Sequence, residues 1–562
     1  MSPTTVEAGV TLCRTLESLK MRHVFALPGT QTVPLFEALR RSRLTTIVPT
    51  HELAASMMAA AYFRVCGRPG VLLTIPGPGF TYALTGLAEA RLDSSALVHF
   101  VPAVTEGPEA RFALQAIPQT DIAASLAKDV FHASDAATLA DVVRQAYDVA
   151  QSGEPGPVVV FLGGQGRPET HSRVAAAHAD AAHVSEAWSR IDAARRPVLF
   201  AGQGCLGSAA ALRSFAEGFH APVVTTASAR GILPEDHPLA MGFDAHRGTA
   251  AAVNDLFGAA DLVIVLGARL GHNGTAGHAL RFPPGRTVRV DADPGVLHST
   301  GSPAALSLVM TVEEFLSHQH VPPATPSGWT DVELADRKRA IRTPLGTPPE
   351  PLLAGRVASE FFARLRTAIP REAIIVTDTG LHQVMARRHL DVLAPGGLMM
   401  PSDFQSMGFG LPAAIAARLA APDRPVVLLI GDGGMAMSGL ELATATRLGL
   451  SIPVIVFDDG QLNQIRLHQQ AEFGADFGVE LPRIDLEALA IATGAAFVEW
   501  QDDISVPIGT ALSRNVPTLL RLPVGDSGGI RYARTVAKAK GAIRRGLGDR
   551  LARRLRQWVG GR

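Results

Sequence analysis

The chain has 562 residues, 47% of them hydrophobic and 19% charged, and its formal net charge is zero. This length predicts about three or four domains with sizeable cores, and the balanced charge argues against a nucleic-acid-binding protein as a whole. The three cysteines lie far apart in the sequence, so we expect small core residues and neither a disulfide framework nor a zinc site.

The first third of the chain alternates between strands and helices. The N-terminus lacks the charged and then apolar segments of a signal peptide, and no uncharged apolar run in the sequence reaches about 18 residues. We therefore expect a cytoplasmic protein. Apolar spacing predicts helices over residues 5–20 and 51–62 and one that ends at residue 92. Strands are predicted over residues 24–27, 46–48, 70–75, 96–101 and 158–162. This alternation predicts an α/β fold with a parallel, doubly wound sheet.

A linker and a second α/β unit follow. Residues 163–187 are rich in Gly, Ala and His without a clear period, which predicts a linker. Strands are predicted over residues 197–201, 222–225, 262–266 and 287–290. Gly202-Gln203-Gly204 is a weak dinucleotide-binding signal, because the next glycine falls at Gly207. Residues 321–353 predict a second linker around one short charged helix.

The third unit carries the most direct chemical signal. A buried strand over residues 426–430 runs into Gly431-Asp432-Gly433-Gly434, and a second strand over residues 453–457 ends in Asp458-Asp459, with a helix expected over 438–448 between them. Ligands bind at strand ends in parallel sheets, bare amides at a helix start suit a phosphate, and paired carboxylates suit Mg²⁺. Although Gly-Asp-Gly alone is a common turn, the whole pattern predicts a metal-diphosphate clamp.

The pattern resembles the thiamine diphosphate signature of the acetolactate synthase and 2-oxo acid decarboxylase family. That resemblance implies Mg²⁺ ligation by Asp432, Asp459 and the main-chain carbonyl of Gln461, with Gly431, Gly433 and Gly434 in the diphosphate turn. Asp458 stands where the family commonly has Asn, which adds negative charge near the metal.

Two N-terminal motifs support the resemblance. Residues 50–70, with His51-Glu52-Leu-Ala-Ala, and residues 77–90, with Gly-Pro-Gly and Leu-Ala-Glu-Ala, are similar to family segments. By spacing alone Glu52 is a dipole partner at a helix start, but the resemblance implies that it hydrogen-bonds the aminopyrimidine ring and promotes proton removal at the reactive carbon. Gln115 resembles a substrate-facing glutamine, spaced from Lys128 as in the family, with Gln119 as the alternative. Pro76 and Thr81 depart from the usual pattern and leave the substrate open.

Further cofactor contacts are implied in the third unit. After a strand over residues 373–376, Asp378-Thr-Gly380-Leu-His382 resembles an element that lies against the diphosphate. Met407 would prop the cofactor in its bent form, and the carbonyl of Gln405, where most relatives have Gly, would accept from the amino group; by spacing alone Met407 is a core residue.

The substrate end of the site is less defined. Arg466 and His468 are the candidates for a carboxylate anchor and a proton donor. No adjacent His-His pair is present, which leans away from simple aldehyde release. The C-terminal residues 531–562 form a basic amphipathic segment, expected as an active-site cover, a solvated tail or a contact with an anionic membrane surface.

The resemblance spans nearly the whole chain and implies an order of domains. These are a pyrimidine-binding domain over 1–170, a middle Rossmann-like domain over 188–320 and a diphosphate-binding domain over 354–530. Some relatives bind FAD in the middle domain, but here only part of that pattern is present, and we favour a spacer. The implied protein is a homodimer or homotetramer with sites between subunits that acts on a 2-oxo acid, with an aldehyde or ketone as a possible acceptor. Carboligation, simple decarboxylation, acyloin cleavage and a non-catalytic partner subunit remain alternatives, as does a flavin or nicotinamide oxidoreductase.

Overall fold

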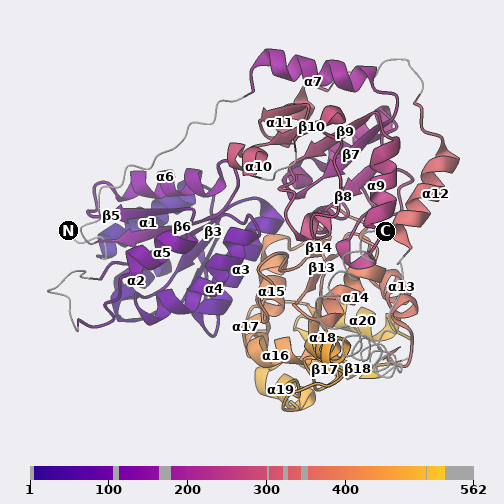
Figure 1. Ribbon diagram of the computed structural model, residues 1–562. Coiled ribbons are helices and arrows are strands. Elements are labelled where there is room, and N and C mark those ends of the chain that lie inside the picture. Colours follow the sequence, from indigo (N-terminus) through magenta and orange to yellow (C-terminus); the bar gives the residue numbers. More distant parts are fainter. Residues whose placement is uncertain are drawn as a thin grey trace.

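The protein folds into three α/β units, each built around its own sheet (Figure 1). The computed structural model describes residues 5–104, 113–163, 179–299, 303–319, 327–343, 352–501 and 503–525. In Figure 1 the first unit lies at the left, the middle unit at the upper right and the third unit below. The predicted three-unit α/β architecture is confirmed.

The first unit has a six-stranded parallel sheet in the order β2-β1-β3-β4-β6-β5. Its strands are β1 His23–Ala26, β2 Thr45–Ile47, β3 Gly70–Leu73, β4 Leu97–Pro102, β5 Asp129–Ala133 and β6 Pro157–Leu162. Its helices are α1 Val6–Ser18, α2 Val33–Arg41, α3 Glu52–Cys66, α4 Pro78–Leu92, α5 Gln119–Leu126 and α6 Leu139–Gln151. Successive side chains of a strand point to opposite faces, and in β1 Phe25 joins one core while Val24 and Ala26 join the other. The sheet is therefore covered on both sides.

The middle unit has a five-stranded parallel sheet in the order β11-β10-β9-β7-β8. Its strands are β7 Pro197–Ala201, β8 Val223–Thr225, β9 Leu262–Leu266, β10 Thr287–Asp291 and β11 Leu306–Val309. Its helices are α7 Ala181–Ala193, α8 Ala209–Gly218, α9 Ala250–Ala259, α10 Pro294–Ser299 and α11 Val312–Ser317, and α12 Asp331–Arg342 leads to the third unit. The C-terminal end of the linker predicted over residues 163–187 is wrong, because helix α7 already begins at Ala181. Asp180 caps this helix and Trp188 packs into the core.

The third unit has a seven-stranded sheet. Its strands are β12 Leu352–Leu353, β13 Ile374–Thr377, β14 Leu398–Met399, β15 Val426–Gly431, β16 Pro453–Asp458, β17 Ala496–Glu499 and β18 Thr518–Gly525. Its helices are α13 Ala358–Ala368, α14 Leu381–His389, α15 Gly410–Ala420, α16 Asp432–Ser438, α17 Glu441–Arg447, α18 Asn463–Phe473, α19 Leu486–Thr493 and α20 Ser505–Leu512. All its paired strands are parallel except β12 with β18.

The helix expected over residues 438–448 is confirmed only over α17, Glu441–Arg447, and its predicted start is wrong. A separate short helix, α16, begins directly at Asp432 and ends at Ser438. The interruption falls at Gly439, where an added Cβ would meet the Met435 carbonyl oxygen at 2.6 Å. The glycine turn therefore passes from β15 into α16 without an intervening loop.

The first and third units share one hydrophobic core. Helix α3 is buried on all sides over its middle, which is typical of a helix enclosed by protein. It packs against the sheet of its own unit and against α15 of the third unit, and α4 lies beside it (Figure 1). Polar contacts support this junction: the Thr50 amide donates to Glu441 at 2.9 Å, and Arg64 donates to the Met400 carbonyl at 2.7 Å.

Buried ion pairs join the middle unit to the third. Arg230 contacts Glu235 at 2.6 Å and also donates to the carbonyl oxygens of Arg387 and Leu390. Arg387 in turn contacts Asp244 at 2.8 Å. Because removing one partner of a buried pair leaves an uncompensated charge, these contacts fix how the units dock.

Other sequence predictions have mixed outcomes. Cys13 and Cys205 are buried and Cys66 is partly buried, and no disulfide links them. None of the described helices combines the length and apolar character that spanning a bilayer requires. The basic segment 531–562 lies outside the described residues, so its predicted role stays a prediction.

Gly86 tests the close contact between α3 and α4. Gly86→Ala should lower the free energy of unfolding by about 1–3 kcal/mol, because the added methyl group overpacks the contact. Its ideal position lies 2.0 Å from Ser56 Oγ. Gly258→Ala is the matched control, since Gly258 is an exposed helical glycine with no atom within 4 Å of its added Cβ. That control should gain up to about 1 kcal/mol. Urea unfolding measures both, and equal stability of G86A and wild type would contradict the packing described.

Candidate active site

A small cavity lies at the carboxyl ends of β13, β15 and β16. Its volume is about 110 Å³. Nine of the residues expected from the sequence line it: Gly380, His382, Met407, Gly431, Asp432, Gly433, Gly434, Asp459 and Gln461. Parallel strands present their carboxyl ends at one edge of the sheet, where ligands bind. The third unit thus gathers its expected cofactor contacts at one place.

Two carboxylates dominate the electrostatics of this cavity. Asp432 accepts hydrogen bonds from the amides of Gly433 at 2.8 Å and Gly460 at 2.6 Å. Asp459 accepts from the Gln461 amide at 3.0 Å and from Asn463 Nδ2 at 2.6 Å. Burial raises the pKa of both carboxyl groups, that of Asp459 to about 6. A bound cation would compensate two carboxylates held out of water.

The donor set fits a hard divalent cation. Among the described residues no group of three or more His, Cys, Asp and Glu side chains forms a metal cluster, so a metal here would need main-chain oxygen as well. The Gln461 carbonyl is such an oxygen, and in this structure it accepts a hydrogen bond from the Asn463 amide at 2.9 Å. Oxygen ligands completed by water or phosphate are those that Mg²⁺ prefers.

Asp458 behaves differently from its expected role. Its carboxylate contacts Arg521 Nε at 2.7 Å, on the neighbouring strand β18. Asp458 and Arg521 are not among the cavity-lining residues. The negative charge of Asp458 is therefore balanced by Arg521, which the sequence alone did not indicate.

His382 presents an unpartnered nitrogen to the cavity. The ring is 4% exposed and packs against Phe457 with 5.6 Å between centroids. Burial lowers the pKa of His382 to about 4, so the ring is neutral near pH 7. Its Nε2 has no hydrogen-bond partner within the described part of the chain. Since buried polar atoms are normally satisfied, this nitrogen fits a ligand oxygen such as one of a diphosphate.

Asp378 is a functional residue that sequence reasoning named only as part of a motif. Its buried carboxylate accepts from the amides of Thr379 at 2.7 Å, Gly408 at 3.1 Å and Gly410 at 2.8 Å. Burial raises the pKa of Asp378 to about 6. Asp378 thus holds the segment that carries Met407 into the cavity.

Gln405 occupies a left-handed backbone conformation. Its φ is +63°, a region that favours glycine. Its side chain donates to the carbonyl oxygens of Pro401 at 2.8 Å and Ser402 at 2.6 Å. These bonds turn the side chain away, and Gln405 is not among the cavity-lining residues.

A second group of expected residues lies in the first unit. Glu52 Oε1 is 3.0 Å from the Cβ position of Gly79, and Gln115 lies against Gly77. Gln31 Nε2 donates to Gln115 Oε1 at 2.5 Å. The sequence motifs did not indicate Gln31. Glu52, Gln115 and Gln31 therefore surround the start of α4.

The alternatives in this region have structural contacts. Gln119 is 1% exposed and donates to the Pro102 carbonyl at 3.2 Å. Lys128 donates to the Glu154 carbonyl at 2.8 Å and to that of Ser152. Because Gln119 is buried and bonded to the main chain, Gln115 remains the more accessible of the two glutamines.

The two groups of residues do not line the same cavity in the described structure. Neither Glu52 nor Gln115 lines the cavity around Asp432. His468 is exposed on α18 and also lies outside the lining residues, while Arg466 donates to Asn463 Oδ1 at 2.9 Å. Each group is half of the expected constellation.

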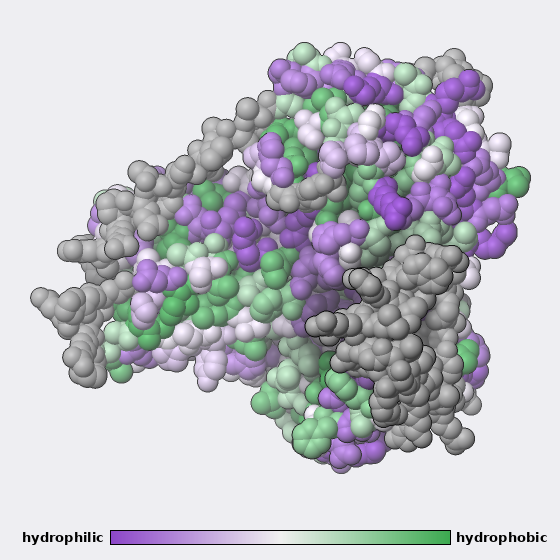
Figure 2. All heavy atoms as spheres, viewed as in Figure 1, coloured by the Kyte–Doolittle hydropathy of each residue, from purple (hydrophilic) through white to green (hydrophobic). Residues whose placement is uncertain are grey.

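Exposed apolar side chains accompany both halves. Val33, Tyr82 and Leu114 are exposed next to the first group, and Met437, Leu440 and Ile465 are exposed on or beside α16 and α18. Figure 2 shows hydrophobic surface over lower parts of the first and third units, whereas the middle unit is mostly hydrophilic. Apolar patches of this kind mark protein interfaces.

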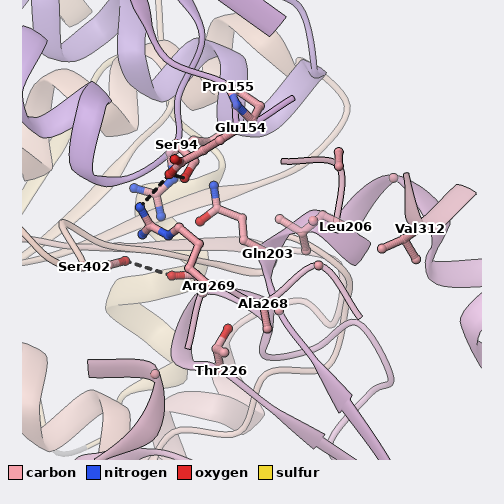
Figure 3. Close-up of a pocket in the computed structure, with 18 of the residues that line it drawn as sticks. Ser94, Glu154, Pro155, Gln203, Leu206, Thr226, Ala268, Arg269, Val312 and Ser402 are labelled. Atoms are coloured by element: carbon pink, nitrogen blue, oxygen red, sulfur yellow. Dashed lines mark hydrogen bonds and ion pairs between the residues drawn. The ribbon is translucent and has the colours of Figure 1, made fainter. Parts of the chain in front are cut away.

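A larger cavity of about 760 Å³ lies where the three units meet (Figure 3). Gln203 points into it, and its Nε2 donates to the Asp93 carbonyl at 2.9 Å. Arg269 reaches across to Glu154 at 3.0 Å and contacts Asp403 at 2.8 Å. Ser94 also donates to Glu154, at 2.8 Å. The cavity is thus walled by polar contacts between units.

The glycines beside this cavity are explained by packing. A Cβ at Gly202 would lie 2.1 Å from the Gly267 carbonyl oxygen, and one at Gly204 would lie 2.9 Å from Gly267 Cα. The loops after β7 and β9 can approach this closely only without side chains. The Gly202-Gln203-Gly204 motif therefore needs no dinucleotide to account for it.

These features define a class of protein: three α/β units with a carboxylate-bearing glycine turn in the third and a helix-start glutamate in the first. Comparisons identify the family. The N-terminal TPP binding domain, central domain and C-terminal TPP binding domain of the thiamine pyrophosphate enzymes match residues 6–124, 184–318 and 378–522. The chain belongs to the thiamine pyrophosphate enzyme family.

Named relatives cover most of the chain. The acetolactate synthase isozyme 1 large subunit of Escherichia coli (strain K12) is 30% identical over 476 residues, 83% of each chain. The probable 2-ketoarginine decarboxylase of Pseudomonas aeruginosa is 31% identical over 526 residues, 89% of this chain and 90% of that protein. The acetolactate synthase large subunit of Parasynechococcus marenigrum is 29% identical over 568 residues, 93% of this chain and 88% of that protein.

His382→Phe tests the unpartnered nitrogen. The variant keeps a ring against Phe457 but loses the donor, so the dissociation constant for thiamine diphosphate should rise about tenfold. His389→Phe on the same helix is the matched control, because His389 also stacks on a phenylalanine, Phe362. Calorimetric titration measures both variants. Equal cofactor affinity in H382F and H389F would remove His382 from the site.

Proposed function

We propose that this chain is a Mg²⁺-dependent thiamine diphosphate enzyme that decarboxylates a 2-oxo acid such as pyruvate and joins the product to a second carbonyl compound. The observation that carries the proposal is the cavity in which Asp432, Asp459 and His382 meet the glycine turn. The names of two relatives, acetolactate synthase and 2-ketoarginine decarboxylase, support chemistry on 2-oxo acids.

Each residue of the third unit has a role in holding the cofactor. Asp432, Asp459 and the Gln461 carbonyl would hold Mg²⁺, which neutralises the diphosphate. His382, neutral and unpartnered at Nε2, would donate to a diphosphate oxygen. Met407 lines the cavity and its methyl carbon lies 3.1 Å from the Cβ position of Gly433. A larger residue than glycine at 433 would fill space that the cofactor needs.

The cofactor, when bound, supplies the electron sink for loss of CO₂. Glu52 would accept a hydrogen bond from, or share a proton with, a ring nitrogen of the pyrimidine, and so assist proton removal at the reactive carbon. Gln115, oriented by Gln31, would face the substrate. Burial of both halves at an interface would exclude water.

We further propose that the complete site forms between two copies of the chain. The separation of Glu52 from the Asp432 cavity and the exposed apolar residues beside both halves support this arrangement. In a symmetric dimer each copy would give its first half to one site and its second half to the other.

Complementation tests the shared site. Glu52→Gln and Asp432→Asn should each abolish activity in homogeneous protein. A heterodimer of the two, purified with a different tag on each chain, should recover about half of the wild-type activity, because one of its two sites then contains only intact residues. The control is a dimer in which both chains carry E52Q, each with a different tag, and it should stay inactive. Failure of the mixed heterodimer to recover activity would place the whole site in one chain.

Product analysis separates the reaction types. With thiamine diphosphate, Mg²⁺ and a panel of 2-oxo acids, we expect CO₂ release and a new hydroxyketone or acetolactate-type product by NMR. Free aldehyde without a coupled product would indicate a simple decarboxylase, and cleavage of a supplied acyloin would indicate a lyase. Cofactor binding without turnover of any compound would favour a non-catalytic partner subunit.

The larger cavity, where the three units meet, has room for a second ligand. We keep the middle unit as a spacer, because the glycines at its rim are required for packing. The absorbance spectrum of the purified protein tests this, since a bound flavin would give a visible chromophore.

A further inference from the structure

Residues 402–408, here called the cofactor loop, connect the two cavities. Ser402 and Asp403 line the larger cavity between the units, and Met407 lines the smaller one around Asp432. Asn273 of the middle unit donates to the Ser402 carbonyl at 2.8 Å, which fixes the start of the loop. The loop has no regular secondary structure, so its polar groups need partners outside itself.

Helix α4 of the first unit and Asp93, which caps its C-terminal end, supply two of these partners. Asp93 accepts from the amides of Ser402 at 3.0 Å and Asp403 at 3.2 Å. Glu89, one turn earlier, accepts at Oε2 from the Ser406 amide at 3.2 Å and also from the Ser406 hydroxyl. The two carboxyl groups thus bind successive parts of the same loop.

The third unit holds the same loop from its own side. Thr379, which lines the smaller cavity, donates from its hydroxyl to the Ser406 carbonyl at 3.1 Å. Asp378 accepts from the Gly408 amide at 3.1 Å. Ser406 is therefore held through its amide and hydroxyl by the first unit and through its carbonyl by the third. Its neighbours on either side are Gln405 and Met407.

Glu89 is an unusual group in this arrangement. It is 1% exposed, and its Oε1 has no partner within the described residues. Burial, together with the negative charge of Asp93, raises the pKa of Glu89 to about 8. Arg64 of α3 faces Asp93 at 3.1 Å, and Arg269 of the middle unit faces Asp403. Both arginines pair with aspartates, and neither forms an ion pair with Glu89 in the described structure.

We propose that Glu89 is a positioning residue of the active site, whose carboxyl group holds Ser406 and thereby fixes Gln405 and Met407 where the cofactor binds. The inference rests on the proposed function for the identity of the cofactor, but not for the loop contact itself. Helix α4 also touches Glu52 at its other end, through Gly79. The helix therefore connects the catalytic glutamate of one half-site with the cofactor loop of the other.

Three variants test the contact in the full-length protein. Glu89→Ala removes the acceptor, Glu89→Gln keeps an acceptor oxygen that cannot ionise, and Ser406→Ala removes the hydroxyl from the other side. Ser451→Ala is the matched control, because Ser451 is a partly buried loop serine of the same unit whose hydroxyl bonds main-chain oxygens of Ala511 and Leu512. Amide hydrogen exchange of the peptide covering the loop is measured without cofactor, and thiamine diphosphate affinity and kcat are measured separately.

We expect faster exchange of the loop in E89A and S406A, and exchange like that of wild type in E89Q and S451A. Thiamine diphosphate should bind about tenfold more weakly to E89A, the size expected for losing a buried hydrogen-bond partner, with rescue in E89Q. Wild-type exchange in both E89A and S406A would overturn the proposal. If wild type binds no thiamine diphosphate, the proposed function fails, while the exchange data still decide whether Glu89 holds the loop.

The pH dependence of stability provides a separate check on Glu89. Because burial raises the pKa of this carboxyl group from 4.5 to about 8 in the folded protein, its contribution to the free energy of unfolding is full below about pH 4.5 and is lost as the pH rises from there to about 8. The free energy of unfolding should therefore fall more steeply between about pH 5 and 8 in wild type than in E89Q, whose amide does not ionise. Equal slopes in wild type and E89Q would contradict the burial of Glu89 against the loop.

Discussion

The close packing of α3 against α4 on one side and α15 on the other is the contact on which the rest of the structure depends. Small residues make it possible: Gly86 lets α4 approach Ser56 of α3, and the alanines of α3 fill the core shared with the third unit. Because protein interiors tolerate little extra volume, this contact fixes the distance between the first and third units. The cofactor loop and its carboxylate partners lie at the edge of that contact, so their geometry follows from it.

Buried carboxyl groups organise the irregular parts of the site. Asp378, Asp93 and Glu89 each accept from main-chain amides of residues 402–410, and Glu441 accepts from Thr50, two residues before Glu52. An irregular loop has no ladder of its own to satisfy its amides, and a carboxylate accepts several bonds at once. The consequence is that the loop carrying Met407 and the turn at Thr50, which leads into α3 and Glu52, are held by side-chain acceptors from other elements.

The arrangement also divides the site into two halves with different chemical tasks. The third unit gathers oxygen ligands and a neutral histidine, which suit a metal and a diphosphate, whereas the first unit presents Glu52 and two glutamines. Apolar side chains are exposed beside each of the two groups. Closure would therefore come with association, which buries those side chains and excludes water from the reacting groups.

The sequence by itself determined the three α/β units, because buried strands and amphipathic helices have periods that local side chains set. It also indicated the candidate site residues of the third unit. Gly431–Gly434 and Asp459 lie at the ends of strands, and the carboxyl ends of parallel strands meet at one edge of the sheet. Tertiary structure alone decided which groups satisfy one another. Arg521 balances Asp458, Glu89 binds Ser406, and α7 begins inside an expected linker because Trp188 has a core to enter. These contacts join residues far apart in sequence, and no local period or spacing reports them, because their partners are chosen by how the units pack.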